Sequence, residues 1–260
     1  MTIIRAPLRQ VSGSPVYLPD ALPLYRGGVA AGGGGGAFTP ASIAGIVDYF
    51  VYDDLTRIKQ SSDGTGAVTS AGDPVGWWRG QLDVITGTQP DPGSKAVYRA
   101  TGLEFGYIGY IDAPYAVGCG SAITIAMAYN TGTTGAGVGA SLVTRDVDPH
   151  NGYYPGGGAS TRTYAKGGEN NATDGSASLT GRIRRIYRFN GTTATMIVNG
   201  GAPVSLSTVG AITENSNILR MFLNLNNPSD LKAVCCAIYS TSISDEDATA
   251  LDSQWLETYP

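Results

Sequence analysis

The sequence predicts an all-β protein built as an antiparallel sandwich, on three observations. Glycine accounts for 37 of the 260 residues, about twice its usual share. Charged residues make up 15%, against about 25% in an average globular protein. Short apolar runs alternate with Gly, Asn and Asp from residue 46 to residue 228, and no helix-period pattern interrupts them. The absence of such a pattern disfavours crossover helices and a parallel sheet.

The strands and turns follow from the apolar runs and the dipeptides between them. Asn190-Gly191 and Asn199-Gly200 favour the positive φ angles of tight hairpin turns. We therefore expect a hairpin at each of these two dipeptides. The clearest strand candidates are residues 46–52, 102–108, 122–129, 141–145, 181–189, 194–198, 218–223 and 231–239.

The last residues of the chain predict one helix, residues 244–257, folded onto the sandwich. Ser244 is a good N-cap, and the three acids after it suit the first turn of a helix. Four apolar residues then recur at helical spacing, which indicates a buried stripe in which the tryptophan belongs to the core. These residues are Ala248, Leu251, Trp255 and Leu256.

The first residues do not resemble a packed domain. Four prolines occur within the first 23 residues, too many for a helix and too irregular for a central strand. Apolar residues nevertheless recur, which predicts an extended arm, residues 1–31, that docks on this chain's own domain or on a neighbour. A glycine-rich hinge, residues 32–37, joins the arm to the sandwich domain, residues 38–260. The docking candidates are Ile3, Leu8, Tyr17 and Leu18.

Composition excludes several classes of function. A single histidine, His150, does not provide the two imidazoles of common zinc sites. The apolar runs are far shorter than the ~18 residues of a membrane helix, and the net charge of −4 favours no binding of nucleic acid. Cys235 and Cys236 are adjacent, so on a strand they point to opposite faces and do not bridge; we expect reduced thiols in a buried strand.

Several segments in order resemble the concanavalin A-like (laminin G-like) jelly-roll domains of bacteriophage virion proteins. They are residues 48–55, 72–78, 102–106, 122–127, 188–200 and 237–256. The resemblance covers residues 38–258 and has no counterpart for the arm. Gly106 stands where the family strand has an aspartate, and residues 79–83 replace a longer polar loop.

The resemblance implies a concanavalin A-like jelly roll with a structural role in a phage particle. The role is either capsid decoration or a tail, baseplate or fibre protein whose lectin-like domain contacts host surface glycans. The partners implied are other virion proteins, held through the arm, and host polysaccharide. We expect a homo-oligomer located in the virion and assembled in the host cytoplasm. A free carbohydrate-binding lectin and a polysaccharide depolymerase are the alternatives.

The acidic residues show no pattern typical of an enzyme active site. A glycoside hydrolase works with two carboxylates about 5–9.5 Å apart, and none of the five glutamates stands in a paired motif. A Ser-His-Asp arrangement would have to recruit His150 from a Gly- and Pro-rich loop. We therefore expect no catalytic residues, and an isolated domain without enzymatic activity.

Aromatic residues near glycine-rich loops are the candidates for glycan contact, because an aromatic ring stacks on a sugar at low entropic cost. Trp77 and Trp78 are neighbours on a predicted strand, so one ring faces the core and the other faces solvent. Tyr153, Tyr154 and Tyr164 flank a glycine-rich loop; ordinary packing of sheet tyrosines is the alternative.

One loop offers oxygen ligands. Asp146, Asp148 and Asn151, together with loop carbonyls, form a candidate Ca²⁺ site, because calcium takes 6–8 oxygen ligands. A turn capped by the same Asp and Asn side chains is the alternative. No other cofactor is expected.

Four arginines crowd one predicted strand: Arg182, Arg184, Arg185 and Arg188. Alternation places Arg182, Arg184 and Arg188 on one face, where like charges repel. Acids on an adjacent strand, a neighbouring subunit or an anionic glycan would each relieve this repulsion. The four arginines are therefore interface candidates.

Overall fold

The computed structural model describes residues 38–106, 109–113, 122–131, 142–144, 161–165, 168–172, 181–190, 193–206, 219–221 and 231–260. The chain divides into two units, Met1–Ala37 and Phe38–Pro260, and every described residue belongs to the second. The arm, the hinge and the four docking candidates Ile3, Leu8, Tyr17 and Leu18 lie outside the described residues and stay predictions.

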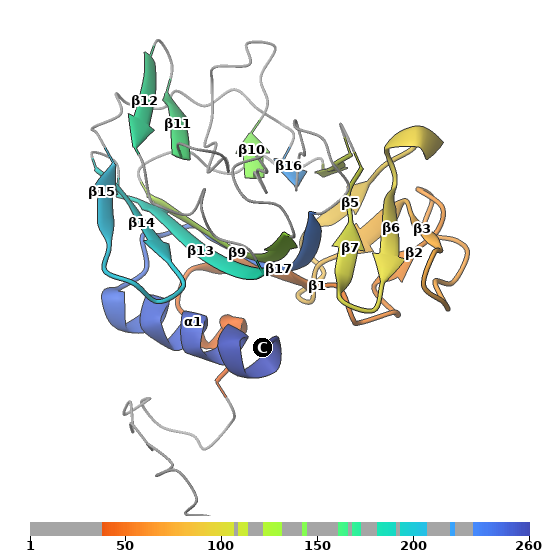
Figure 1. Cartoon of the computed structure of the whole chain (residues 1–260), viewed down its shortest axis with the longest axis horizontal. Coiled ribbons are helices and arrows are strands. Elements are labelled where there is room, and N and C mark those ends of the chain that lie inside the picture. The colour runs from red at the N-terminus through yellow and green to blue at the C-terminus, as the bar shows by residue number, and fades with distance from the viewer. Residues whose placement is uncertain are drawn as a thin grey trace, which may run out of the picture. The chain divides into compact units, whose positions relative to one another are not determined.

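Antiparallel strands dominate the described structure, which confirms the all-β jelly-roll sandwich (Figure 1). The larger sheet runs in the order β15-β14-β13-β9-β17-β7-β6-β3, with β1 also paired to β17. Its strands are β1 (Ile46–Val51), β3 (Pro74–Val75), β6 (Ala96–Arg99), β7 (Gly102–Glu104), β9 (Ile123–Thr131), β13 (Gly181–Phe189), β14 (Ala194–Val198), β15 (Val204–Leu206) and β17 (Lys232–Tyr239).

A six-stranded sheet runs in the order β10-β16-β8-β5-β4-β2. Its strands are β2 (Ile58–Lys59), β4 (Trp77–Arg79), β5 (Thr86–Thr88), β8 (Ile111–Ala113), β10 (Leu142–Thr144) and β16 (Leu219–Met221). A separate pair consists of β11 (Thr161–Ala165) and β12 (Gly168–Ala172).

All eight apolar runs contain a strand, and β13 and β14 have the predicted bounds. The turn after β14 also forms as predicted: Asn199 has a φ of 48° and Gly200 a φ of 70°. The Gly201 N–H donates to the Val198 carbonyl at 2.9 Å, which closes this turn. The sequence pattern missed β2, β3, β5, β6, β8, β11, β12 and β15, because strands of two to five residues with polar members show little alternation; β4 was predicted only through its adjacent tryptophans.

The predicted C-terminal helix is α1 (Asp245–Thr258). The Ser244 hydroxyl accepts a hydrogen bond from the Asp247 N–H at 3.0 Å, which confirms the N-cap. Trp255 is buried, as expected, whereas Leu256 is 49% exposed. The prediction that Leu256 belongs to the buried stripe is wrong, because its position on the helix turns it away from the sheet. Two short 3₁₀ helices complete the structure, η1 (Pro40–Ser42) and η2 (Pro92–Ser94).

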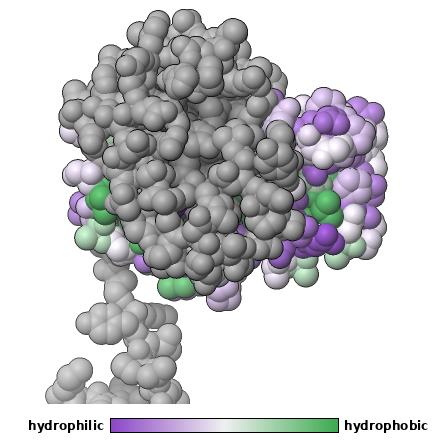
Figure 2. Space-filling view, turned by 45° about the horizontal axis from the view of Figure 1, so that its top comes forward, coloured by the Kyte–Doolittle hydropathy of each residue, from purple (hydrophilic) through white to green (hydrophobic). Residues whose placement is uncertain are grey.

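The surface of the described residues is mostly polar. Figure 2 shows hydrophilic residues predominating where the surface is coloured, with hydrophobic residues singly or in small groups. Among the described residues, the large hydrophobic side chains classed as exposed are Leu82, Val84, Val204 and Leu256. Within this part of the chain, no helix has the length and apolar character needed to cross a membrane.

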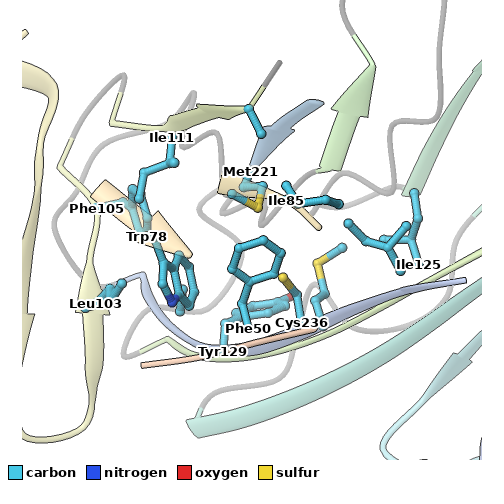
Figure 3. Close-up of a cluster of buried hydrophobic side chains, with 14 of the residues drawn as sticks. Phe50, Trp78, Ile85, Leu103, Phe105, Ile111, Ile125, Tyr129, Met221 and Cys236 are labelled. Carbon is cyan, nitrogen blue, oxygen red and sulfur yellow. The ribbon is translucent and has the colours of Figure 1, made fainter. Parts of the chain in front are cut away.

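The main core lies between the two large sheets. Trp78 of the six-stranded sheet packs edge-on against Phe50 of the larger sheet, with ring centroids 5.3 Å apart. The Trp78 indole N–H donates to the Val51 carbonyl at 3.2 Å. Figure 3 shows Phe50, Tyr129 and Cys236 of the larger sheet together, facing Trp78, Ile111 and Met221 of the six-stranded sheet. Both sheets therefore contribute large apolar side chains to one continuous core.

A second core lies on the outer face of the larger sheet, where α1 covers β13, β17 and their neighbours. Because both faces of β17 are covered, its sequence is apolar at nearly every position instead of alternating. Cys235 faces the helix side and Cys236 the main core, and both are free thiols, as predicted. Burial raises the pKa of both thiols well above the ordinary value.

The Asp48 side chain lies inside the sandwich, where it joins a loop to a strand. The Asp48 carboxylate is fully buried and accepts hydrogen bonds from the Leu82, Val84 and Ile85 N–H groups at 2.9, 3.0 and 2.7 Å. A Cβ atom on Gly80 would lie 2.1 Å from the Asp48 Cγ, so only glycine fits at position 80. Asp48 therefore binds the loop that follows β4 to the first strand of the larger sheet.

Candidate functional site

The two adjacent tryptophans of β4 point in opposite directions. Trp78 is fully buried, whereas Trp77 is half-buried on the outer side of the six-stranded sheet. This confirms the predicted alternation and identifies Trp77 as the outward ring. It also removes Trp78 from the candidate surface contacts, because its indole is enclosed by the core.

Backbone register places four residues in one row across neighbouring strands. Lys59 of β2 pairs with Trp77, Trp77 pairs with Thr88 of β5, and Thr88 pairs with Asp112 of β8. Directly paired residues share one face of a sheet, so all four face outward with Trp77. We call this row the Trp77 face. Because strands lie about 4.8 Å apart, the row is about 14 Å long.

The Trp77 ring has polar surroundings. A Cβ on Gly64 would lie 3.5 Å from Trp77 Nε1, so the loop at Gly64 borders the ring. The Trp77 indole N–H makes no hydrogen bond with the described part of the chain, while the equivalent group of Trp78 does. The ring therefore offers an apolar surface and an available donor to a ligand.

Charged side chains adjoin this face. Arg57 and Arg79 both pair with the Asp83 carboxylate, the second at 2.9 Å from Arg79 Nε to Asp83 Oδ1. Arg57 also donates to the Gly80 carbonyl at 3.1 Å. Lys59 and Asp112 supply one positive and one negative group within the row itself. A flat ring flanked by donors and acceptors is suited to a polyhydroxylated ligand, which has both apolar faces and hydroxyl groups.

Two arginines of β13, Arg184 and Arg188, pair with carboxylates of this chain. Arg184, Arg188 and Arg182 share the outer face, as predicted, but the carboxylates that pair with Arg184 and Arg188 do not come from an adjacent strand. Arg184 binds Asp252 of α1 through two hydrogen bonds, at 3.0 and 3.2 Å. Arg188 pairs with Asp245 at 2.6 Å. The helix therefore supplies the carboxylates, and Arg184 and Arg188 are buried beneath it.

Arg185 points the other way. Its side chain is buried in the main core, with the guanidinium 5.8 Å from the centre of the Tyr129 ring. Arg184, Arg185 and Arg188 are therefore internal side chains of this chain. Only Arg182 keeps substantial exposure, and it remains an interface candidate.

A small groove of about 130 Å³ lies between α1 and the turn after β14. Its carboxylates, Asp245 and Asp252, are already engaged by Arg188 and Arg184. A Cβ on Gly200 would lie 2.9 Å from Asp252 Oδ2, so glycine allows the turn to approach the helix. The groove is lined by Ile197, Gly200, Gly201, Pro203, Asp245, Ala248, Thr249 and Asp252.

The remaining candidates fall mostly outside the described residues. Tyr153 and Tyr154 lie there, as do the calcium candidates Asp146, Asp148 and Asn151, so the calcium site stays a prediction. Tyr164 belongs to β11, where its backbone pairs with Glu169. In the part of the chain that the structure describes, no group of three or more His, Cys, Asp or Glu side chains is placed to hold a metal ion.

Sequence reasoning missed Lys59, Thr88 and Asp112. They come from three strands of two or three residues, and only the register between those strands brings them beside Trp77. The sole local signal was the adjacent Trp77-Trp78 pair, which marked one strand but not its neighbours.

Among known proteins, only solved structures resemble this chain, and the resemblance is one of fold. The sequence matches no protein-family model and no curated protein. The sialidase of Trypanosoma rangeli matches 84% of this chain and 35% of its own, with 13% identity and a TM-score of 0.53. A botulinum neurotoxin type C structure matches 83% of this chain and 53% of its own, with 11% identity and a TM-score of 0.52. These likenesses show that the chain has the β-sandwich fold present in those proteins.

Sugars are prominent among these structures. The Trypanosoma rangeli sialidase has been solved with sialic acid, in a structure with 11% identity and a TM-score of 0.52. The neurotoxin depends on interaction with two ganglioside molecules to reach the inside of cells. This chain spans about a third of the sialidase length and about half of the neurotoxin chain.

The comparisons also correct one expectation. The sequence predicted that the chain is not an enzyme, but sialidases are enzymes and share its fold. Neither the β-sandwich nor the low content of charged residues therefore excludes enzymatic activity. None of the structures compared bears on the resemblance to phage virion proteins.

Proposed function

We propose that this chain binds glycans and that the Trp77 face is its binding surface. The observation that carries the proposal is the half-buried Trp77 ring, held outward among Lys59, Thr88 and Asp112 with an indole N–H that the described residues leave available. Stacking of a ring on a sugar, with polar groups to either side, is a common mode of carbohydrate recognition. The sugars bound by proteins with this fold support the choice of ligand class.

The Trp77→Ala variant tests this proposal. A glycan array first identifies a ligand for the unmodified chain, and calorimetric titration then compares the variants. We expect Trp77→Ala to weaken binding roughly thirtyfold, since a central aromatic contact contributes about 2 kcal/mol. The free energy of unfolding should change little, because the ring lies outside the core.

The matched control is Leu256→Ala, which removes a solvent-facing apolar side chain from α1, behind the larger sheet. Its affinity should equal that of the unmodified chain. Full affinity in Trp77→Ala, or equal losses in both variants, would show that the Trp77 face is not the binding surface.

The particle role is a finer proposal that rests on the sequence. The resemblance to phage jelly-roll domains and the proline-rich apolar segment before residue 32 support a domain displayed on a virion, on the capsid or the tail, and assembled in the host cytoplasm. In that setting the glycan is a host surface polysaccharide and the chain is a homo-oligomer.

Deletion of residues 1–30 tests the anchoring part of this role. The shortened chain should fold normally, with an unchanged circular dichroism spectrum, and should be missing from purified particles. Normal amounts of the shortened chain in particles would contradict an anchoring arm.

A further inference from the structure

A second row of polar residues crosses the outer face of the larger sheet, on the opposite side of the molecule's core from the Trp77 face. Glu104 of β7 pairs with Lys232 of β17, Lys232 pairs with Asn130 of β9, and Asn130 pairs with Arg182 of β13. These four residues therefore share one face. Arg182 lies two positions before Arg184, on the side of β13 that α1 covers, but its side chain remains partly exposed.

The two cations of this row have no carboxylate partner among the described residues. Arg99 occupies both oxygens of Glu104, at 3.0 and 3.3 Å, and so removes the nearest carboxylate from Lys232. Arg182 makes two hydrogen bonds, both to neutral acceptors: Nε to Asn130 Oδ1 and one terminal nitrogen to the Tyr259 carbonyl, each at 2.6 Å. The described residues accept no hydrogen bond from the other guanidinium N–H groups of Arg182, so these groups can donate to a ligand.

The geometry brings the two cations toward one another. Arg182 and Lys232 stand on either side of Asn130, so their backbones are about 10 Å apart. The hydrogen bond from Arg182 Nε to Asn130 draws the guanidinium over the centre of the row, toward Lys232. Burial lowers the pKa of Arg182, and an anion placed beside a partly buried guanidinium relieves that cost.

Tyrosine rings border the same site. The Tyr259 ring lies 6.1 Å from the Tyr52 ring, which in turn lies 6.4 Å from the Tyr98 ring. The Tyr259 hydroxyl donates to Asp53 at 3.2 Å, so that carboxylate is engaged.

We propose that Arg182 and Lys232, with Asn130 between them and Tyr259 and Tyr52 beside them, form a binding site for an acidic sugar. A guanidinium recognises a carboxylate through parallel N–H donors, and the tyrosine rings provide the flat surface against which a pyranose ring packs. This site is separate from the Trp77 face and does not depend on it.

The test compares two sugars that differ in one carboxylate. The ¹⁵N-labelled full chain is titrated with D-glucuronic acid and with D-glucose at neutral pH, while the Arg182 Nε–H resonance is followed by NMR. Glucuronate should shift this resonance in a saturable manner, and glucose should not. Raising the salt concentration to about 0.5 M should weaken the binding, because salt screens exposed charges.

Variants locate the site. Arg182→Gln and Lys232→Gln should each weaken glucuronate binding at least fivefold, measured by shifts of neighbouring backbone amides, and the double variant should abolish it. Lys59→Gln removes a cation from the opposite sheet and Trp77→Ala removes the other proposed site; both should retain full affinity. Thermal melts show whether each variant is folded. If Arg182→Gln does not fold, the affinity of Lys232→Gln for glucuronate tests the site.

Four results would overturn the proposal, three of them at the proposed site itself. They are equal binding of glucose and glucuronate, unchanged affinity in the double variant, and binding of a glutamate-rich peptide without binding of glucuronate. Loss of glucuronate binding in Trp77→Ala alone would assign the acidic sugar to the Trp77 face and would likewise overturn a separate site.

Discussion

Replacing Asp48 by alanine is expected to lower the free energy of unfolding by about 3–5 kcal/mol. The carboxylate is fully buried and accepts the N–H groups of Leu82, Val84 and Ile85 together with that of Tyr49. Alanine leaves these donors without an acceptor in a space that packing does not refill. Urea denaturation followed by tryptophan fluorescence measures the loss.

Two further variants sharpen the test of Asp48. Asp48→Asn keeps the shape but places an amide N–H₂ where two N–H donors already point, so we expect it also to be destabilised, by about 2–3 kcal/mol. Glu257→Ala removes an exposed carboxylate from α1 and should stay within about 0.5 kcal/mol of the unmodified chain. Similar stabilities for all three variants would show that Asp48 does not hold the loop in place.

The Trp78→Ala variant is expected to lose about 3–5 kcal/mol of stability, the second large effect. Its ring fills the centre of the main core against Phe50, and its N–H satisfies the Val51 carbonyl. Truncation leaves a cavity between the sheets and a carbonyl without its donor. Thermal and urea unfolding both measure this change.

Trp77→Ala is the natural control for Trp78→Ala, since it removes the same atoms from the neighbouring position on the other side of the strand. We expect a stability change below about 1 kcal/mol, together with the loss of glycan affinity predicted above. One tryptophan of the pair would then account for stability and the other for binding. The reverse pattern, a large loss of stability at position 77 and none at 78, would contradict the assigned directions of the two rings.

The long strands β1, β9, β13 and β17 could be predicted because each presents six or more residues to the sequence pattern, and the shorter β14 because turn signals bound it on both sides. β13 and β14 were predicted with their observed bounds, and the turn at Asn199-Gly200 was predicted from its need for positive φ angles. β2 and β5 of the six-stranded sheet could not be predicted, since β2 is two residues long and β5 contains a glycine between two threonines. Packing against Ile111 and Met221, and not any local preference, selects Gly87 there.

The candidate site shows the same limit. The outward direction of one tryptophan follows from alternation, so Trp77 could be found. Its neighbours Lys59, Thr88 and Asp112 meet it only through the register of three pairings, which no local spacing encodes. The partners of the arginines were hidden for the same reason: Asp252 lies 68 residues beyond Arg184 in the chain, on a helix and not on an adjacent strand.

The central place of β17 in the larger sheet has a consequence for how the chain folds during synthesis. β17 pairs with β9 on one side and with β1 and β7 on the other. The pairing of Ile46 with Tyr239 therefore forms only after about 190 further residues have been synthesised. At the usual 5–20 residues per second, a ribosome needs roughly 10–40 s to make that stretch. Until β17 is made, β1 lacks this partner, and so does β9 once it has been synthesised; unpaired strand edges of this kind favour aggregation. The strand that joins β1 and β7 to β9 is therefore made after all three of them.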